Sequence, residues 1–235
     1  SDFSDYYIAC PEGSTIKIDD VRDISFSPDS KFLAMSYNND IFLYNLTTNE
    51  IYNITDDGRW NHIINGTTDW VYEEEYGFTQ AYAFSPDGAE IAYLKFDESH
   101  VKEFEMMRYD NKLYNEAYRF KYPKAGEENS IVTLHVYNIA TGHTRTIDTG
   151  AQTDQYLPRI GYTPAGDLFY YRVNRLQNHF EVVLVAKDGT QRVIYNEQDD
   201  RYVERPSAAT ITFIDGDRFI VREETTTGWF HLYLH

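Results

Sequence analysis

Cysteine, long apolar runs and positive charge are all scarce in this 235-residue sequence. Cys10 is the one cysteine, so an intramolecular disulfide and a cysteine-based metal cluster are both excluded. No apolar stretch approaches the roughly 20 residues that a membrane-spanning helix needs. Lysine and arginine number 21 against 38 acidic residues, which gives a formal net charge of −17. Such a field repels phosphate backbones and anionic lipid, so nucleic acids and membrane surfaces are poor partners, whereas a cationic ligand group is attracted.

Aromatic residues, in contrast, are abundant: the chain has 21 Tyr and 14 Phe, and 42% of its residues are hydrophobic. Tyr and Phe favour strands over helices, so the composition predicts an ordered β protein, either one large all-β domain or two ordinary ones. The histidines show no spacing typical of metal ligands, and we expect neither a metal site nor a cofactor. They are His62, His100, His135, His143, His179, His231 and His235.

One pattern recurs four times along the chain. In each copy a strand ends in an aromatic residue, a turn of the Ser/Thr-Pro-Asp-Gly type follows, and a second strand runs beyond it. Further turns such as TTNE, ATGH and KDGT separate a third strand from a fourth. Four antiparallel strands per repeated unit are typical of β-propeller blades. The copies begin with FSPDSKFLAMSYNND at Phe26, FSPDGAEIAYLKFDE at Phe84, YTPAGDLFYYRVN at Tyr162 and FIDGDRFIVREE at Phe213.

The repeat predicts an all-β fold, a partial β-propeller of about four to five four-stranded antiparallel blades. A generic antiparallel sandwich is the alternative, and the recurrence of the whole set of turns argues against it. The chain stops at GWFHLYLH inside a strand pattern, so we expect a piece of a larger propeller. The gap of 78 residues between Phe84 and Tyr162 exceeds what a blade needs. An inserted arm at about 97–126 accounts for the excess.

The segment DWVYEEEYGF, residues 69–78, places three glutamates side by side between aromatic residues. A charge run is usually a solvated face, and this is the plain interpretation. The segment lacks the alternation of a strand and lies between the last strand of one unit and the first of the next. We therefore expect a short, near-helical insertion that projects from a blade toward the central side of the propeller or toward a neighbouring domain.

Several motifs, taken in order, resemble the amino-terminal β-propeller of the dipeptidyl peptidase IV branch of the prolyl oligopeptidase family. They are NNDIFLYN, NGTTDWVYEEE, FSPDGAEIAYLKFDE and KYPKAGEENSIVTLHVYN. The resemblance covers nearly the whole chain and implies that residues 1–235 are a fragment of an eight-bladed propeller. It also implies a parent serine exopeptidase that releases dipeptides with proline or alanine at the second position. The parent's Ser, Asp and His triad belongs to a C-terminal α/β-hydrolase domain, a partner of this region. This chain has no Gly-x-Ser-x-Gly nucleophile elbow, so we expect it to hold no catalytic residue and to be inactive alone.

The resemblance also assigns site residues. In the family, two neighbouring glutamates of this run bind the free amino terminus of a peptide; in register these are Glu74 and Glu75, preceded by Glu73. An ammonium group has three donors, and each carboxylate can accept them as charge-assisted hydrogen bonds. Because only the amino-terminal end of a peptide carries this amine, binding it fixes the position of cleavage after the second residue of the peptide. Arg205 in YVERPSAATITF matches an arginine that lines the pocket for the second substrate residue. A further family arginine, which grips a substrate carbonyl, falls at STIKID, where Lys17 is the nearest base, and that role is not transferred.

Two other functions remain open at this point. A related peptidase of the same family, such as a tripeptidyl peptidase, would place its amine-binding carboxylates farther from the cleaved bond, so that one more substrate residue fits between them. The full DWVYEEE run favours a dipeptidyl peptidase. A non-catalytic propeller would instead bind proteins on its flat face. Reading the gene downstream of His235 for the nucleophile elbow separates an enzyme from a scaffold.

The arm and the location of the protein complete the expectations. Large apolar groups are unusually dense in residues 104–120, and they cannot all face inward from a single hairpin. Exposed aromatic and methionine surface often marks an interface, and the corresponding arm of the family reaches to a second subunit. We therefore expect a homodimer contact at Phe104–Phe120 in the full-length protein; folding back onto its own propeller is the alternative. The resemblance further implies a periplasmic, secreted or cell-surface protein of a bacterium.

Overall fold

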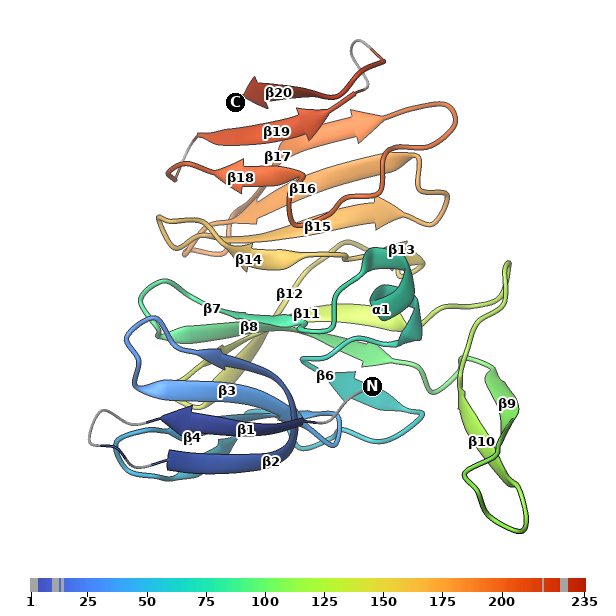
Figure 1. Cartoon of the computed structure of the whole chain (residues 1–235). Coiled ribbons are helices and arrows are strands. Elements are labelled where there is room, and N and C mark those ends of the chain that lie inside the picture. The colour runs from blue at the N-terminus through green and yellow to red at the C-terminus, as the bar shows by residue number, and fades with distance from the viewer. Residues whose placement is uncertain (1–3, 10–12, 14, 217, 225–227) are drawn as a thin grey trace.

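Four antiparallel β-sheets follow one another in chain order, from the blue sheet at the bottom of Figure 1 to the red sheet at the top. The computed structural model describes residues 4–9, 13, 15–216, 218–224 and 228–235. Cys10 lies outside these residues. One short helix and one separate hairpin complete the described chain. No helix among the described residues is long and apolar enough to cross a membrane.

The strands of each sheet are nearly consecutive in sequence. The first sheet has the order β1 (Ser4–Ala9), β2 (Thr15–Phe26), β3 (Phe32–Tyr37), β4 (Asp40–Asn45) and β5 (Ile51–Asn53). The second has the order β12 (His143–Ile147), β11 (Ile131–Asn138), β8 (Glu90–Asp97) and β6 (Ile63–Asn65), and β7 (Tyr82–Phe84) also pairs with β8.

The last two sheets repeat this plan. The third has the order β13 (Gln155–Tyr156), β15 (Leu168–Asn174), β16 (His179–Val185) and β17 (Gln191–Gln198), and β14 (Ile160–Tyr162) also pairs with β15. The fourth contains β18 (Ile211–Phe213), β19 (Phe219–Glu223) and β20 (His231–Leu234). In the last three sheets a three-residue strand, β7, β14 or β18, is followed in sequence by longer antiparallel strands. The succession of four such antiparallel sheets confirms the blades of a partial β-propeller. The sandwich alternative is wrong, because the strands form four successive sheets.

The aromatic residue of each repeat closes the strand that precedes the repeat's turn. β2, β7, β14 and β18 end at Phe26, Phe84, Tyr162 and Phe213. The turn that follows is held by its serine: the Ser27 hydroxyl donates to Asp29 Oδ1 at 2.7 Å and accepts from the Phe32 amide at 2.9 Å. Ser85 and Asp87 repeat the first of these bonds at 2.6 Å. The recurring Ser-Pro-Asp motif is therefore a local turn device, with a side chain satisfying backbone donors.

Side chains between neighbouring sheets form the core. One large buried cluster joins the second, third and fourth sheets to the helix, and a smaller one joins the first sheet to the second. Burial alternates along strands such as β11, whose inward positions Val132, Leu134 and Val136 are buried between more exposed neighbours. This period of two is what a strand requires when one of its faces is more deeply buried than the other.

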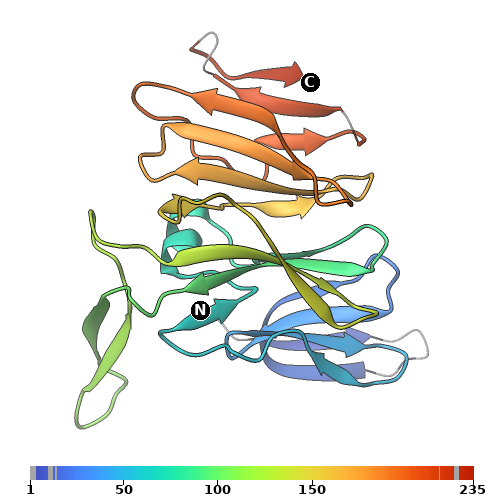
Figure 2. The ribbon, with the colours of Figure 1, turned by 180° about the vertical axis from the view of Figure 1, so that it is seen from behind.

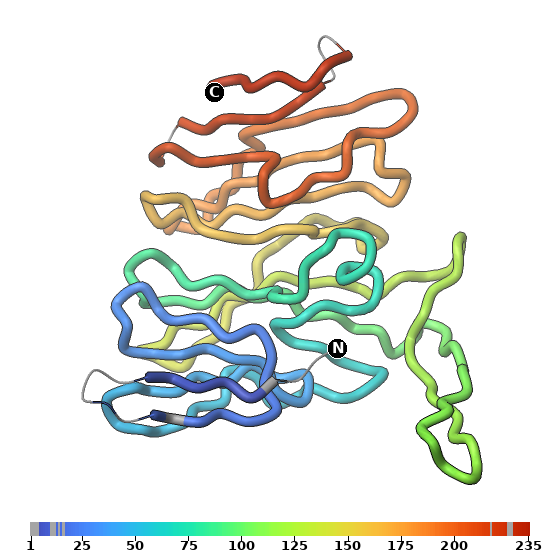
Figure 3. Tube along the Cα trace, in the orientation of Figure 1, coloured from blue at the N-terminus to red at the C-terminus, as the bar shows by residue number. Residues whose placement is uncertain are grey.

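The arm is a two-stranded hairpin that stands apart from the sheets in both views of the ribbon (Figures 1 and 2). β9 (Glu103–Arg108) pairs with β10 (Glu116–Lys121), and all six residues of β9 are exposed. Figure 3 shows the chain leaving the second sheet after β8, making the hairpin and returning to β11. The arm meets the body through ring contacts of Trp60 with Tyr118 and of Trp70 with Tyr122, at centroid separations of 6.1 and 4.2 Å.

Candidate functional site

The glutamate run lies on the helix α1 (Trp70–Tyr76), which confirms the expected short, non-strand segment. Asp69 begins the helix: its Oδ1 accepts from the Tyr72 amide at 3.0 Å, while its Oδ2 accepts from the Ser130 hydroxyl at 2.6 Å. An aspartate is a favoured N-cap because it satisfies an amide that has no partner within the helix. Burial raises the pKa of Asp69, and its two hydrogen bonds oppose that rise. Gly77 ends the helix with φ 66°, a left-handed conformation that glycine adopts without strain.

The buried face of α1 fixes its orientation. Val71, Tyr72 and Tyr76 are buried, and the Tyr72 ring lies edge-on to Phe96 at 4.9 Å. The Tyr72 hydroxyl accepts a hydrogen bond from the Leu157 amide at 2.8 Å, which ties the helix to the third sheet's first connection. Burial raises the pKa of Tyr72 well above its usual range. The phenol therefore stays neutral, and a rotation of the helix would break a buried hydrogen bond.

An arginine holds the carboxyl end of the helix. Arg159 Nη2 donates to the Tyr76 carbonyl at 3.0 Å, and the guanidinium carbon lies 4.2 Å from the centre of the Phe78 ring. Its positive charge complements the negative end of the helix dipole. Thr68 adds a second tie, because its hydroxyl donates to the Phe78 carbonyl at 3.0 Å. Both ends of α1 are thus fastened by side chains from outside it.

The three glutamates have different surroundings because successive helical residues are turned by about 100°. Glu73 is half-buried and pairs with Arg22 at 3.4 Å. Glu75 is exposed and pairs with Arg205, 130 positions away in sequence, at 3.2 Å. Glu74 is exposed, and no residue that the structure describes makes an ion pair or hydrogen bond with its carboxylate. Glu74 is therefore open to a ligand, and Glu75 is held beside it.

Two cavities flank the helix. One of about 790 Å³ is lined by Glu75 and Tyr76 together with residues of the arm's base. The other, of about 330 Å³, is lined by Glu73 and Glu74. The surface around the glutamate run is thus hollowed on both sides, and the helix forms the ridge between. An acidic ridge of this kind can accept the ammonium group of a ligand.

The structure brings some of the predicted residues together and leaves others apart. Arg205 reaches Glu75, so two of the assigned residues are in direct contact. Lys17 lies on β2 and pairs with Asp5 at 3.0 Å and with Asp19, and these bonds raise its pKa. Sequence reasoning missed Arg22, which lies on the same strand as Lys17, three residues before the first SFSPD sequence begins at Ser25. Its position near that repeat is the signal that could have found it.

Comparison with protein families assigns the chain to one of them. The model of the "Dipeptidyl peptidase IV (DPP IV) N-terminal region" family matches residues 5–235. The chain belongs to this family. A dipeptidyl peptidase 4 of Trichophyton tonsurans is 30% identical over 252 residues, which cover 99% of this chain and 32% of the relative. That of Trichophyton rubrum is 31% identical over 229 residues, which cover 92% of this chain and 29% of the relative.

Solved structures agree with the family assignment. The crystal structure of Porphyromonas gingivalis dipeptidyl peptidase 4 has 35% sequence identity and a TM-score of 0.88, over 98% of this chain and 34% of that one. A putative dipeptidyl aminopeptidase IV from Bacteroides ovatus has 28% identity and a TM-score of 0.78, over 94% and 30% of the two chains. The chain thus spans about a third of the length of these dipeptidyl peptidase IV relatives.

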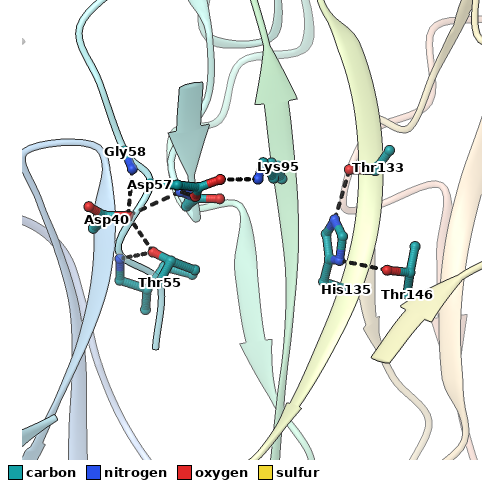
Figure 4. Close-up of polar contacts among 10 residues, drawn as sticks. Asp40, Thr55, Asp57, Gly58, Lys95, Thr133, His135 and Thr146 are labelled. Atoms are coloured by element: carbon teal, nitrogen blue, oxygen red, sulfur yellow. Dashed lines mark hydrogen bonds and ion pairs between the residues drawn. The ribbon is translucent and has the colours of Figure 1, made fainter. Parts of the chain in front are cut away.

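A second polar cluster in this dipeptidyl peptidase IV region is structural (Figure 4). Asp40 Oδ1 accepts from the Thr55 hydroxyl at 2.6 Å, the Gly58 amide at 3.0 Å and Asn65 Nδ2 at 3.1 Å. Asp57 pairs with Lys95. Gly58 is required there, because a Cβ would lie 2.5 Å from a backbone carbonyl oxygen. These contacts fasten the loop after β5 against β4, β6 and β8.

His135 is engaged in the same part of the molecule (Figure 4). Its ring nitrogens lie 2.8 Å from the Thr133 hydroxyl and 3.1 Å from that of Thr146, and its ring stacks on Tyr93. Burial lowers the pKa of His135, so the ring is neutral at pH 7. Among the described residues, no three His, Cys, Asp or Glu side chains are grouped to hold a metal ion.

Proposed function

We propose that this chain is the part of a dipeptidyl peptidase that binds the free amino terminus of a peptide, through Glu74 and Glu75. The observation that carries the proposal is the contrast between the two carboxylates on α1. Glu74 has no ionic or hydrogen-bonding partner among the described residues, and Glu75 is held by Arg205 at 3.2 Å. A free carboxylate beside an oriented one is what a three-donor ammonium group needs.

The fastening of α1 supports the same proposal. Exposed ion pairs contribute only about 0–1 kcal/mol to stability, so the contact between Glu75 and Arg205 serves to orient the carboxylate rather than to hold the fold together. The helix beneath it is fixed by Asp69, Tyr72 and Arg159. Because the helix is fixed, its carboxylate pair holds the peptide's amine in one position. The distance from that amine to the bond that is cut is therefore constant. We propose that Arg205, which pairs with Glu75, also lines the pocket of the second substrate residue.

The reaction belongs to the full-length protein. We propose that it is a serine-type hydrolase that releases dipeptides with proline or alanine at the second position. Its triad is proposed to lie in a C-terminal α/β-hydrolase domain, which would attack the scissile carbonyl while this region holds the amine. The acidic ridge supplies binding groups and no nucleophile. We expect the purified 235-residue chain to leave a Gly-Pro chromogenic substrate uncut.

The test is substitution in the full-length protein. Glu74→Ala or Glu75→Ala is expected to lower kcat/KM for a Gly-Pro chromogenic substrate by about 100-fold or more, since loss of one charge-assisted partner costs roughly 3 kcal/mol. Glu50→Ala, an exposed acid in the turn before β5, is the matched control and should leave kcat/KM within about twofold. Unchanged rates in both α1 variants would reject the proposal. Release of tripeptides from a longer peptide would reject the dipeptidyl assignment alone.

We also propose that the arm forms part of a homodimer contact in the full-length protein. We propose that this protein is periplasmic, secreted or at the cell surface of a bacterium. The support for the dimer contact is the exposure of the arm's tip, where Leu113 and Tyr114 are 91% and 80% exposed. Replacing residues 104–120 by a short Gly-Ser turn should shift the full-length protein from dimer to monomer in sedimentation velocity. A dimer of unchanged affinity would show that the interface lies elsewhere.

A further inference from the structure

Aromatic side chains line much of the smaller cavity beside α1. It lies between the helix, the arm and the loop before β6, and has a volume of about 330 Å³. Trp60 is 59% exposed although it borders this cavity, and the Tyr118 and Phe120 rings lie 5.5 Å apart. Large exposed aromatic surface beside a hollow marks a binding site more often than a structural one. The apolar lining consists of Trp60, Ile64, Trp70, Met106, Tyr118 and Phe120.

The charged groups of the cavity are unbalanced. Two bases face four acids, and each base already has a partner. Arg22 pairs with Glu73, and the Lys121 ammonium donates to the backbone carbonyls of Ser99 and Val101 at 3.3 and 2.7 Å. The cavity therefore carries an excess of negative charge that attracts cations. Its acids are Asp69, Glu73, Glu74 and Glu98.

Glu98 is the unusual member of this set. The side chain lines the cavity although the residue is only 6% exposed, and its carboxyl makes no hydrogen bond to any residue in the part of the chain that the structure describes. Burial raises the pKa of Glu98 to about 7; the charge of Asp69 adds to the rise and that of Lys121 opposes it. A buried carboxyl without a donor is costly, and a cationic donor entering the cavity would relieve that cost.

We propose that this cavity binds a primary alkylammonium group, with Glu98 as the acceptor of its N–H bonds. A primary ammonium supplies the hydrogen bonds that Glu98 lacks, which a quaternary ammonium cannot do. Its alkyl stem packs on the Trp60 and Tyr118 rings, where the charge gains cation–π attraction. The cavity shares Glu74 with the proposed acceptor of the peptide's amino terminus. Its own acceptor is Glu98, which lies after β8, whereas Glu75 borders the other cavity.

The test uses n-butylammonium as the probe and the 235-residue chain as the protein. Binding is followed by calorimetry and by tryptophan fluorescence, because two of the three tryptophans, Trp60 and Trp70, border the cavity. We expect saturable binding that is at least about tenfold tighter than binding of tetramethylammonium or 1-butanol, which lack the donors or the charge. Glu98→Gln, nearly isosteric, should weaken it at least about tenfold, the loss of one charge-assisted partner. Glu128→Gln, an exposed acid that does not line this cavity, should leave it unchanged.

Trp60→Ala provides a second variant that does not depend on a buried substitution, because Trp60 is largely exposed. It should weaken n-butylammonium binding while leaving the circular dichroism spectrum unchanged. Equal affinity in wild type, Glu98→Gln and Trp60→Ala would overturn the proposal, as would absence of saturable binding. A loss with Glu74→Gln or Glu75→Gln but not with Glu98→Gln would assign the probe to the acidic ridge and also overturn it, without bearing on peptide hydrolysis.

The pH dependence of binding gives a further check. Only the ionised Glu98 carboxylate attracts the cation, so affinity should rise between pH 6 and 8, while an alkylammonium of pKa ~10.4 stays charged throughout. Glu98→Gln should flatten this profile, and a steep profile in that variant would contradict the proposal. Nα-acetyl-lysine methylamide, whose α-amine is blocked, tests whether the ligand is a lysine side chain of a peptide or a small alkylamine. Binding close to that of n-butylammonium identifies the lysine side chain. Exclusion of the lysine derivative identifies a small alkylamine. The other charged groups around Glu98 are Asp69, Asp97 and Lys121, with Arg22, Glu73 and Glu74 also lining the cavity.

Discussion

Two insertions interrupt the connections of the second sheet, and they are built on opposite principles. The α1 segment between β6 and β7 is fixed at its start by Asp69, on its buried face by Tyr72 and at its end by Arg159. The arm between β8 and β11 has one fully exposed strand, β9, and one partly exposed strand, β10, and its rings contact the body at Trp60 and Trp70. A segment that orients a ligand must be rigid, whereas a segment that meets another protein needs accessible surface.

The largest expected effect is at the helix N-cap. Asp69→Ala removes the acceptor of the Tyr72 amide and leaves the Ser130 hydroxyl without its partner. We expect a loss of about 2–4 kcal/mol in the free energy of unfolding, the sum of a cap and an unsatisfied buried group. Urea denaturation measures it. Asp69→Asn keeps a cap acceptor and should lose much less; equal losses would show that capping does not fix α1.

A smaller effect separates two tyrosines of the same helix. The Tyr72 hydroxyl accepts from the Leu157 amide, whereas the buried Tyr76 hydroxyl has no partner among the described residues. Tyr72→Phe should therefore cost about 1–3 kcal/mol by leaving an amide unsatisfied, and Tyr76→Phe should be neutral or stabilising. Thermal or urea unfolding of the two variants gives the comparison directly. The reverse order of stability would mean that the helix is not held through Leu157.

The smallest effect is expected at the tip of the arm. Leu113→Ser combined with Tyr114→Ser changes two highly exposed side chains, so the free energy of unfolding should move by less than about 0.5 kcal/mol. Urea denaturation of the chain provides the measurement. A loss above about 1 kcal/mol would show that the arm packs on the body more closely than its exposure indicates, and the contrast with α1 would fail.

Much of the fold could be predicted because its signals are local. The aromatic residue and Ser-Pro-Asp turn at Phe26 and Phe84 mark the end of a first strand, and the hydrogen bonds of Ser27 and Ser85 explain why that motif recurs. The short helix at the glutamate run followed from missing strand alternation. The extra strands β1, β6 and β13 were not predicted, since they pair through contacts that no local pattern announces.

Only some residues of the candidate site could be predicted from the sequence. The resemblance pointed to Glu74 and Glu75, and the contact of Arg205 with Glu75 places a third assigned residue beside them. The pairing of Arg22 with Glu73 was missed because it joins residues 51 positions apart. The burial of Glu98 was missed for a related reason: a glutamate after a strand is ordinarily solvated, and only the packing of α1 and the arm encloses this one.

The central claim is that Glu74 and Glu75 bind the ammonium group of a peptide, and one cycle tests it most directly. kcat/KM of the full-length protein is measured for glycyl-Pro-p-nitroanilide and acetyl-Pro-p-nitroanilide, which differ essentially by the amine, in wild type and in Glu74→Gln combined with Glu75→Gln. We expect wild type to favour the glycyl substrate by about 1,000-fold or more and the double variant to favour it by less than about tenfold, because the lost interaction is worth several kcal/mol. An unchanged preference in the double variant would contradict the account.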